Sequence, residues 1–413
     1  MLRDYQQNAV NSALAHWGST RKEVPGVLVL PTGSGKSHVI AELCHKSDSP
    51  VLILQPSKEI LEQNYTKLRN YGIDDIGIYS ASAGRKDVGK YLYATIGSIY
   101  KKPEMFQDYK TILMDECHFY SPKNSGGMYN KFFKEVKPER IVGLTATPYR
   151  QQQRYVYKGH EIETITEIQM INRIPPFYFR QMLDVVGIRE LIEQGYLVKP
   201  EYVEGRKQYD IRQLRLNSTG ADYREADVRQ FWDDGKLKDI AKSIDDIEGS
   251  ISRNLIFCST IEQAQRCSQM LTEMKLSSEW ITSEDSMKDR TEILKRFREG
   301  KIKHLCNVGI LTTGFDFPEL DCITVARPTL SLALWYQMVG RGMRKYPGKD
   351  RFYVIDICNN VKRLGRVETI TYGKEEGYKD IVLTELGKIS GIPLREFTIL
   401  RTSKTEEDAE QEI

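Results

Sequence analysis

The chain has 413 residues, of which 40% are hydrophobic and 28% charged, and its formal net charge at pH 7 is +3. This length allows two or three domains with separate cores, and the composition is typical of a globular protein. A charge so near zero neither requires nor excludes a nucleic-acid partner, because basic groups can gather in one groove. The polar start MLRDYQQNAV is unlike a signal peptide, and apolar runs such as VLVL are too short to span a bilayer, so we expect no membrane partner.

The seven cysteines are scattered, and none forms a CxxC pair. A zinc ribbon is therefore not expected. Several lie in apolar runs such as LIFCST, where a thiol packs as a small hydrophobic group. We expect reduced, buried cysteines in a cytoplasmic protein, of a bacterial cell or a phage-infected host.

Short apolar runs separated by helical stretches fill the first part of the chain. The runs are GVLVLP, PVLILQP, YLYATIG, TILMDE and RIVGLTATP. They are rich in Val, Ile and Leu without alternation, which is typical of strands buried on both faces. In EILEQNYTKLRNY, the apolar residues recur at helical spacing. This alternation predicts an α/β domain with a parallel sheet and right-handed crossovers.

The first of these runs leads into the loop PTGSGKS, which precedes a helical stretch. A strand before and a helix after are the context of a phosphate-binding loop. Glycines let the backbone turn its N–H groups inward, and the helix N-terminus favours an anion. Lys36 would reach the β- and γ-phosphates, and the Ser37 hydroxyl would bind Mg²⁺. The full motif has a further glycine where this chain has Leu30.

The run ILMDECHFY ends a predicted strand with two carboxylates. Ligands bind at the carboxyl ends of the strands in open parallel sheets. Asp115 would hold Mg²⁺, and Glu116 would orient or deprotonate the attacking water. An isolated Asp-Glu pair is more often a solvated strand end. After a phosphate loop in the same domain, it predicts the second half of a nucleotide site.

The pattern loosens between residues 151 and 199, where RYVYKGHEIETITEIQMINRIPPFYFRQ has mixed polarity and a Pro-Pro pair. This composition indicates a linker or crossover. A strand candidate, KPEYVEG, then starts a second series with RNLIFCST, SEWITS, KHLCNVG, DCITVARP and RFYVIDI. We expect α/β domains at 1–165 and 199–370, a linker at 166–198 and an extension at 371–413. The acidic end, KTEEDAEQEI, is expected to be a frayed tail.

These residues, in this order, resemble helicase superfamily 2 of the DExH-box kind. LRDYQQ is similar to the Q motif, PTGSGKS to motif I, MDECH to motif II and GLTATP to motif III. LQPSKEILEQ and ATIGSIY resemble motifs Ia and Ib, and LIFCST, GILTTGFDFPELD and QMVGRGMR resemble motifs IV, V and VI. The sequences of these motifs most resemble those of RadD-type DNA-repair helicases of bacteria and phages. Those carry a cysteine-rich zinc-binding region after the core, which this sequence lacks, so properties located there are not carried over.

The resemblance implies two tandem RecA-like domains with parallel sheets and ATP with Mg²⁺ in the cleft between them. The implied nucleotide-binding residues are Arg3, Gln6, Pro31, Thr32, Gly33, Ser34, Gly35, Lys36, Ser37, Gly314 and Asp316. Gln6 is placed to pair with the adenine edge, and Asp115 completes the Mg²⁺ ligands with Ser37. Arg344, with Arg341 beside it, would act across the cleft as an arginine finger, and Gln337 would help to seat water or phosphate. His118, Thr145 and Thr147 would couple the nucleotide site to the strand-binding face.

The resemblance also places small donors along a sugar-phosphate path. The implied nucleic-acid contacts are Ser57, Lys58, Thr95, Ser98, Ser259 and Thr313. Each hydroxyl could equally cap a helix or strand end. Phe315, Phe317, Trp335 and Tyr336 could stack on bases, although core packing is the commoner fate of such aromatics. Contacts of this kind go to the backbone, so binding should be independent of sequence and weaken with salt.

We expect an ATP-dependent DNA helicase or translocase that acts in recombination, repair or at replication forks. Single-stranded or branched DNA is the expected substrate, and a single-strand-binding or recombination protein is an expected partner. Two alternatives stay open. The core motifs do not exclude an RNA helicase, and an ATP-gated clamp would bind nucleic acid without moving along it.

Overall fold

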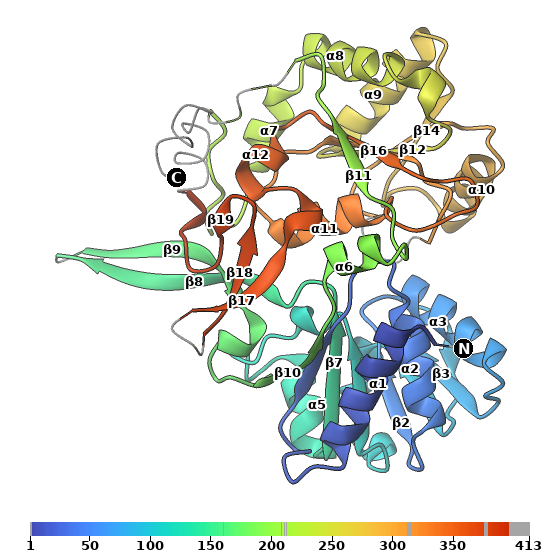
Figure 1. The fold of residues 1–413 in the computed structure, drawn as a ribbon, viewed down its shortest axis with the longest axis vertical. Helices are drawn as coiled ribbons and strands as arrows, with labels where there is room; N and C mark the ends of the chain where they lie inside the picture. The colour runs from blue at the N-terminus through green and yellow to red at the C-terminus, as the bar shows by residue number, and fades with distance from the viewer. Residues whose placement is uncertain are drawn as a thin grey trace. The chain divides into compact units, whose positions relative to one another are not determined.

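The computed structural model describes residues 2–159, 161–207, 209, 211, 213–311, 316–375 and 379–395. The described chain forms two compact units. Unit 1 is drawn from 1–150, 170–187 and 374–380, and unit 2 from 151–169, 188–373 and the residues from 381 onward (Figure 1). Within this described part, no helix is both long and apolar enough to cross a bilayer.

Unit 1 is built on an eight-stranded sheet with the order β10-β1-β7-β6-β2-β5-β3-β4. Neighbouring strands are parallel except for the pair β3–β4. The predicted apolar runs form its centre, which confirms a parallel α/β sheet. The strands are β1 (Gly26–Val29), β2 (Val51–Leu54), β3 (Ile76–Ser80), β4 (Arg85–Lys86), β5 (Tyr91–Ala94), β6 (Thr111–Asp115), β7 (Arg140–Thr145) and β10 (Gln181–Val185).

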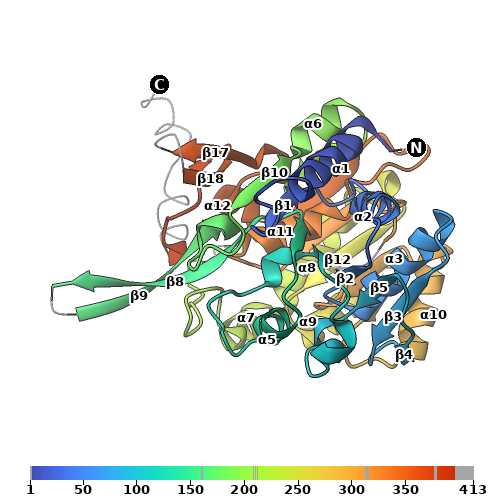
Figure 2. The same cartoon turned by 90° about the horizontal axis from the view of Figure 1, so that it is seen from below.

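The helices of unit 1 cover both faces of this sheet. Helix α2 (Lys36–His45) packs between α1 (Asp4–Trp17) and α3 (Lys58–Asn70) on one face. Helix α5 (Met128–Val136), which contacts the short α4 (Ile96–Ile99), lies on the other face (Figure 2). In α3, Leu61 and Leu68 are fully buried, as the helical spacing predicts.

Strand β10 lies in the stretch that the sequence indicated as a linker or crossover. It pairs in parallel with β1, from Gly26 opposite Gln181 to Val29 opposite Val185. Sequence analysis missed this strand because its side chains are only half-buried, so QMLDV has no continuous apolar run.

Unit 2 contains a six-stranded, fully parallel sheet with the order β11-β16-β15-β12-β14-β13. All six strands coincide with the predicted runs. They are β11 (Pro200–Val203), β12 (Asn254–Cys258), β13 (Ser278–Ile281), β14 (His304–Asn307), β15 (Cys322–Ala326) and β16 (Phe352–Asp356). The helices are α6 (Ile188–Glu193), α7 (Glu225–Phe231), α8 (Asp234–Asp245), α9 (Ile261–Glu273), α10 (Met287–Arg298), α11 (Leu332–Gly340) and α12 (Asn360–Leu364).

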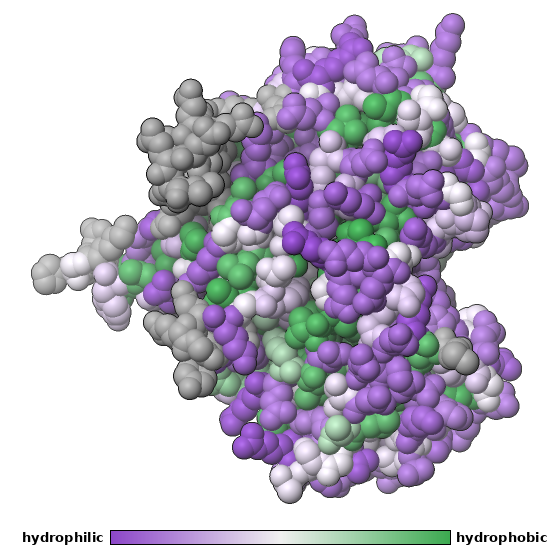
Figure 3. Space-filling model, viewed as in Figure 1, coloured by the Kyte–Doolittle hydropathy of each residue, from purple (hydrophilic) through white to green (hydrophobic). Residues whose placement is uncertain are grey.

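The apolar face of α8 packs inward on α9, and the surface over these two helices is mainly hydrophilic (Figure 3). Trp335 and Tyr336 of α11 are buried in the core, and Phe317 is also buried. These three aromatics therefore have the core role rather than base stacking, while Phe315 lies outside the described residues. All seven cysteines are buried and free, as expected.

Two smaller sheets complete the described chain. Strands β8 (Tyr149–Lys158) and β9 (Glu161–Met170) form a long hairpin that extends away from the six-stranded sheet of unit 2 (Figures 1 and 2). Strands β17 (Thr371–Glu375), β18 (Lys379–Thr384) and β19 (Gly387–Lys388) form a three-stranded sheet within the predicted extension. The predicted acidic tail lies outside the described residues.

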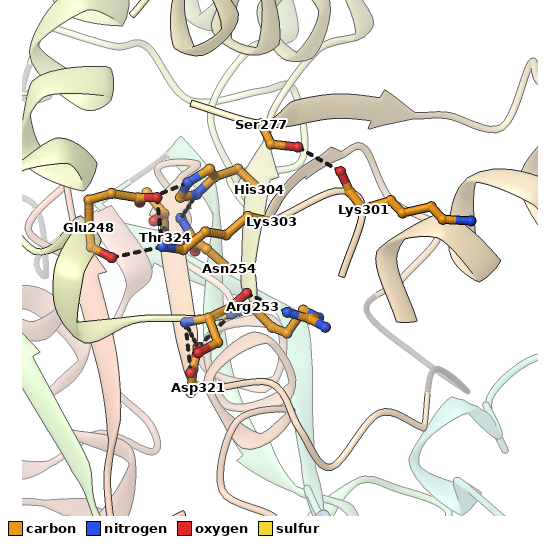
Figure 4. Close-up of polar contacts among 10 residues, drawn as sticks. Glu248, Arg253, Asn254, Ser277, Lys301, Lys303, His304, Asp321 and Thr324 are labelled. Carbon is orange, nitrogen blue, oxygen red and sulfur yellow. Dashed lines mark hydrogen bonds and ion pairs between the residues drawn. The ribbon is translucent and has the colours of Figure 1, made fainter. Parts of the chain in front are cut away.

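A buried polar network joins the amino ends of β12, β14 and β15 (Figure 4). His304 is fully buried, with Nε2 2.9 Å from Glu248 Oε2 and Nδ1 3.3 Å from Asn254 Nδ2. Thr324 Oγ1 donates to Asn254 Oδ1 at 3.1 Å, and Lys303 Nζ lies 2.6 Å from Glu248 Oε1. Burial lowers the pKa of His304 to about 4, so the ring is neutral at pH 7.

Candidate nucleotide and nucleic-acid sites

The predicted phosphate loop leaves β1, which lies between the edge strand β10 and β7, and enters α2. Gly33 and Gly35 have φ of 84° and 82°, which only glycine adopts without strain. The Ser34 N–H donates to Pro31 O at 3.1 Å, which closes the turn. Gly35 is the N-cap of α2, so Lys36 and Ser37 are the first residues of this helix. The loop therefore brings backbone N–H groups and the helix N-terminus to one point.

Helix α1 holds this loop through two side chains. Tyr5 Oη and Gln6 Nε2 both donate to the carbonyl oxygen of Ser34, at 2.6 and 2.7 Å. Gln6 Oε1 accepts from the backbone N–H of Arg3 at 3.0 Å, which completes the N-terminal cap of α1. Sequence analysis missed Tyr5, although it lies in the same motif. The adenine contact of Gln6 stays a prediction.

The loop fits a phosphate group and a hard cation. The Ser34 hydroxyl is buried and has no hydrogen-bond partner among the described residues. Buried polar groups of this kind are expected to bind a ligand or water. Ser37 Oγ and the Asp115 carboxylate are the oxygen ligands that Mg²⁺ prefers. Lys67 of α3, which sequence analysis did not identify, donates from Nζ to Ser37 Oγ at 3.3 Å.

The two carboxylates of the Asp-Glu pair have different surroundings. Asp115 ends β6 and is buried, and its Oδ1 accepts from the Glu116 N–H at 3.0 Å. Burial and the neighbouring Glu116 charge raise the pKa of Asp115, while Lys36 opposes this shift. Glu116 has a φ of 48°, an unusual backbone conformation for this residue type that occurs at functional sites. Its Oε1 lies 3.6 Å from Lys36 Nζ.

His118 links Glu116 to the end of β7. Its Nδ1 lies 2.8 Å from Thr145 Oγ1, 3.3 Å from Thr147 Oγ1 and 3.3 Å from Glu116 Oε2. Burial lowers the pKa of His118, so the ring is neutral at pH 7. The structure thus brings together the three residues that the sequence proposed for coupling. Their role in coupling stays a prediction.

The residues of unit 1 that were predicted to contact nucleic acid follow strands β2 and β5, at the same edge of the sheet. Ser57 caps α3 by accepting from Ile60 N at 3.5 Å, and Lys58 pairs with Glu62 at 3.8 Å. Thr95 Oγ1 lies 2.9 Å from Ser98 Oγ. The Ser57 hydroxyl thus has the alternative role of a helix cap, whereas Thr95 and Ser98 contact each other and Thr95 makes no side-chain capping bond to α4. A contact with nucleic acid stays a prediction.

In unit 2, Ser259 follows β12 and lines a cavity of about 440 Å³ together with Tyr223 and Arg327. The Ser259 and Tyr223 hydroxyls are both buried without a hydrogen-bond partner within the described part of the chain. This cavity could take a polar group of a bound strand. The other predicted residues of this region, Thr313 and Gly314, lie outside the described residues.

The motif QMVGRGMR forms the last turns of α11 and the segment after it. Gln337 lies in α11, and Arg341 is the buried C-cap of this helix. Arg344 Nη1 forms an ion pair with Asp316 Oδ1, so the structure joins two residues predicted from different motifs. Burial lowers the pKa of Arg344 to about 10, and the guanidinium stays charged at pH 7.

Two family models match this chain. Residues 1–150 match the model described as "Type III restriction enzyme, res subunit", and residues 235–346 match "Helicase conserved C-terminal domain". The putative ATP-dependent helicase IRC3 of Saccharomyces cerevisiae is 24% identical over 86% of this chain and 51% of its own length. The DNA 3'-5' translocase XPB2 of Sulfurisphaera tokodaii is 24% identical over 83% of this chain and 79% of its own.

Solved structures with this fold include two restriction enzymes. A fragment of a putative HsdR subunit from Vibrio vulnificus superposes with a TM-score of 0.63 at 20% identity, over 88% of this chain and 66% of that one. The type ISP enzyme LlaBIII, bound to DNA, gives 0.60 at 19% identity, over 87% and 28%. The chain spans 51% of the length of the Saccharomyces cerevisiae relative and 58% of the length of the putative mitochondrial ATP-dependent helicase irc3 of Schizosaccharomyces pombe. Together, the tandem RecA-like fold and these two family models support helicase superfamily 2 as the family of this chain.

Proposed function

We propose that this chain is an ATP-dependent DNA helicase or translocase, in which ATP hydrolysis drives movement along DNA or remodelling of it. The observation that carries the proposal is the contact of Lys36 with Glu116 beside Ser37 and Asp115, at the carboxyl edge of the first sheet. This is the arrangement that phosphoryl transfer to water requires.

In unit 1, the residues bind the nucleotide and orient the water. The loop around Ser34 and the N-terminus of α2 hold the phosphates through backbone N–H groups. Mg²⁺, held by Ser37 and Asp115, would supply positive charge at the phosphate oxygens. The Glu116 carboxylate, positioned by Lys36 and by its strained backbone, orients or deprotonates the attacking water.

In unit 2, Arg344 is the proposed arginine finger, with Arg341 and Gln337 beside the phosphates. An arginine finger contributes roughly 10³ to 10⁵ in turnover. Turnover then requires both units to close on one nucleotide, and hydrolysis lets them part. Asp316 would hold the Arg344 guanidinium in the conformation it needs for this step.

DNA is the proposed substrate because relatives are named as DNA translocases and helicases. An RNA helicase is the alternative, supported by the likeness in fold to yeast Dbp5 bound to RNA, at a TM-score of 0.54. We also propose a RadD-type branch, cytoplasmic localisation and a single-strand-binding or recombination partner. These rest on the sequences of the motifs. A clamp that binds nucleic acid without moving along it is the second alternative.

The deciding experiment measures ATP hydrolysis with single-stranded, duplex and forked DNA and with RNA, alongside strand displacement. DNA-stimulated turnover with displacement or translocation supports the proposal. Stimulation by RNA alone favours the RNA helicase, and ATP-dependent binding without hydrolysis favours the clamp. Lys36→Ala and Arg344→Ala should abolish turnover in a folded protein. Arg351→Ala is the matched control, because this exposed arginine only approaches Glu201 at 3.9 Å.

A further inference from the structure

Lys349 has an unusual environment for a lysine. Its side chain is buried, with the residue only 8% exposed, and it follows the motif that contains Arg344. Its Nζ donates to three backbone carbonyl oxygens, those of Pro318 at 3.0 Å, Gly342 at 2.6 Å and Arg344 at 3.0 Å. An ammonium group has three donors, so these bonds use all of them.

The three carbonyls belong to two separate segments that meet at Lys349. Gly342 and Arg344 follow α11, whereas Pro318 lies two residues after Asp316. The side chains of Arg344 and Asp316 form the ion pair described above. Lys349 therefore fixes the backbone on both sides of this pair.

Further contacts restrain the segment around Arg344. Leu197 forms a β-bridge with Arg344, and Val198 N donates to Met343 O at 2.7 Å. A side chain at Gly342 would collide with the ring of Phe352, so the backbone there lies directly against β16. Together with the bonds from Lys349, these contacts restrain the backbone at Gly342, Met343 and Arg344.

This arrangement is costly for folding. Burial lowers the pKa of Lys349 to about 7 and Arg344 adds to this shift, while Asp321 and Glu319 oppose it, so the ammonium form with three donors predominates below pH 7. Burying a cation costs free energy that an apolar side chain of similar length would not. The ammonium is therefore better explained by the geometry that it imposes than by stability.

We propose that Lys349 is a positioning residue for ATP turnover, which holds Arg344 and Asp316 in the arrangement needed at the γ-phosphate. This inference rests on the proposed function, because it takes Arg344 as the arginine finger. The Lys349 ammonium donates to backbone carbonyls and lies 5.6 Å from the centre of the Phe352 ring, and it would not touch the nucleotide itself.

The test replaces Lys349 by methionine, which keeps the length and removes the charge. A misplacement of about 1 Å at a reacting group can cost about 100-fold in rate, so we expect kcat to fall about 10- to 100-fold. The dissociation constants for ATP and single-stranded DNA should stay within about twofold, because Lys349 contacts neither. Lys303→Met is the control: it removes a partly buried lysine of the same unit whose Nζ binds Glu248 and not the carbonyls of Gly342 and Arg344.

Chemical rescue separates the charge from the fold. Lys349 lines a cavity of about 700 Å³, through which a reagent can reach this position. The seven native cysteines are all buried, so Lys349→Cys can be aminoethylated selectively to a lysine analogue, with mass spectrometry to confirm the site. Aminoethylation should restore kcat, whereas ethylation of the same thiol should not.

The outcomes distinguish this inference from the proposed function. If Arg344→Ala abolishes turnover but Lys349→Met keeps the wild-type kcat, the role of Lys349 is wrong and the proposed function stands. Equal recovery with the ethyl and aminoethyl groups would also overturn it, because filled volume would then suffice. A loss in Lys349→Met that is explained by a lower unfolding midpoint and a smaller folded fraction overturns it too. If Arg344→Ala itself keeps full turnover, Arg344 is not the arginine finger, and that part of the proposed function is wrong.

Discussion

Lys36 Nζ lies 3.6 Å from Glu116 Oε1, and both side chains are largely buried. The phosphate-loop lysine and the second carboxylate of the Asp-Glu pair are thus neighbours, although 79 residues lie between them in the sequence. They meet because β1 and β6 both end at the same edge of the sheet, with only β7 between them. This juxtaposition places a cation and a base at one point.

Replacing Glu116 by glutamine keeps the size of the side chain and removes its charge. We expect turnover to fall by about 10² to 10⁴-fold, the usual contribution of a positioned acid or base. Nucleotide binding should be retained or strengthened, because the loop, Lys36 and Asp115 remain. Steady-state hydrolysis and equilibrium binding of a fluorescent ATP analogue measure the two effects. A variant with normal turnover would show that another group activates the water.

Gly35→Ala should weaken nucleotide binding through backbone strain and a collision. The φ of Gly35 is 82°, and an added Cβ would lie 2.6 Å from Gln6 Nε2. A left-handed conformation costs an L-residue roughly 1–2 kcal/mol, and the displaced Gln6 would lose its hydrogen bond to the Ser34 carbonyl, leaving that of Tyr5. Gly72→Ala is the matched control, since its φ is 81° but nothing lies within 4 Å of the added Cβ. Comparable losses of ATP affinity in both variants would argue against this explanation.

His118→Ala should uncouple hydrolysis from nucleic acid. His118 contacts Glu116 on one side and the hydroxyls of Thr145 and Thr147 on the other. We expect basal hydrolysis to persist, with a smaller stimulation by DNA and little translocation. The comparison is His16→Ala, another buried histidine of unit 1, which only contacts Val24 O. It should lower the free energy of unfolding and leave the stimulation factor unchanged. Undiminished stimulation in His118→Ala would refute the coupling role.

The buried His304 should make stability depend on pH. Its pKa is about 4 in the folded protein against an ordinary value of 6.5, so between these values the unfolded chain binds more protons. The free energy of unfolding should therefore fall as pH drops from 6.5 to 4, by at most about 1.4 kcal/mol per pH unit. The facing charged groups are Glu248 and Lys303 (Figure 4).

Urea unfolding of the wild type and His304→Gln, measured across this pH range, isolates that contribution. Glutamine can still donate to Glu248 but does not titrate. The gap between the two unfolding curves should narrow towards pH 4, because only the wild type loses stability through this group. Curves that stay parallel across the range would contradict the assignment.

Several elements were predictable from local pattern alone. The central strands of both sheets are short runs of Val, Ile and Leu, and burial on both faces leaves no other arrangement for such runs. The sequence PTGSGKS between a strand and a helix predicted the loop, and its glycines have the expected positive φ. The motifs predicted Arg344 and Asp316 as separate site residues, whereas their ion pair was found only in the structure.

Other elements depended on contacts that no local pattern contains. Strand β10 is a half-buried edge strand, defined by its register with β1 and not by its own apolar residues. From the neighbouring sequence alone, the donors Tyr5, Lys67 and Lys349 look like ordinary surface or core residues. Their partners are backbone carbonyls or a hydroxyl, which carry no residue-specific signal in the sequence.

The sequence by itself therefore determined the two parallel α/β sheets, the phosphate-binding loop and the identity of the ionisable groups. It could do so because burial and backbone conformation restrict residue types locally. Only the tertiary structure decided which carbonyl or hydroxyl each buried donor meets, and so which residues support the predicted ones. The physical reason is that any residue can supply a backbone carbonyl, so its position in space depends on the packing of helices and strands from distant parts of the chain.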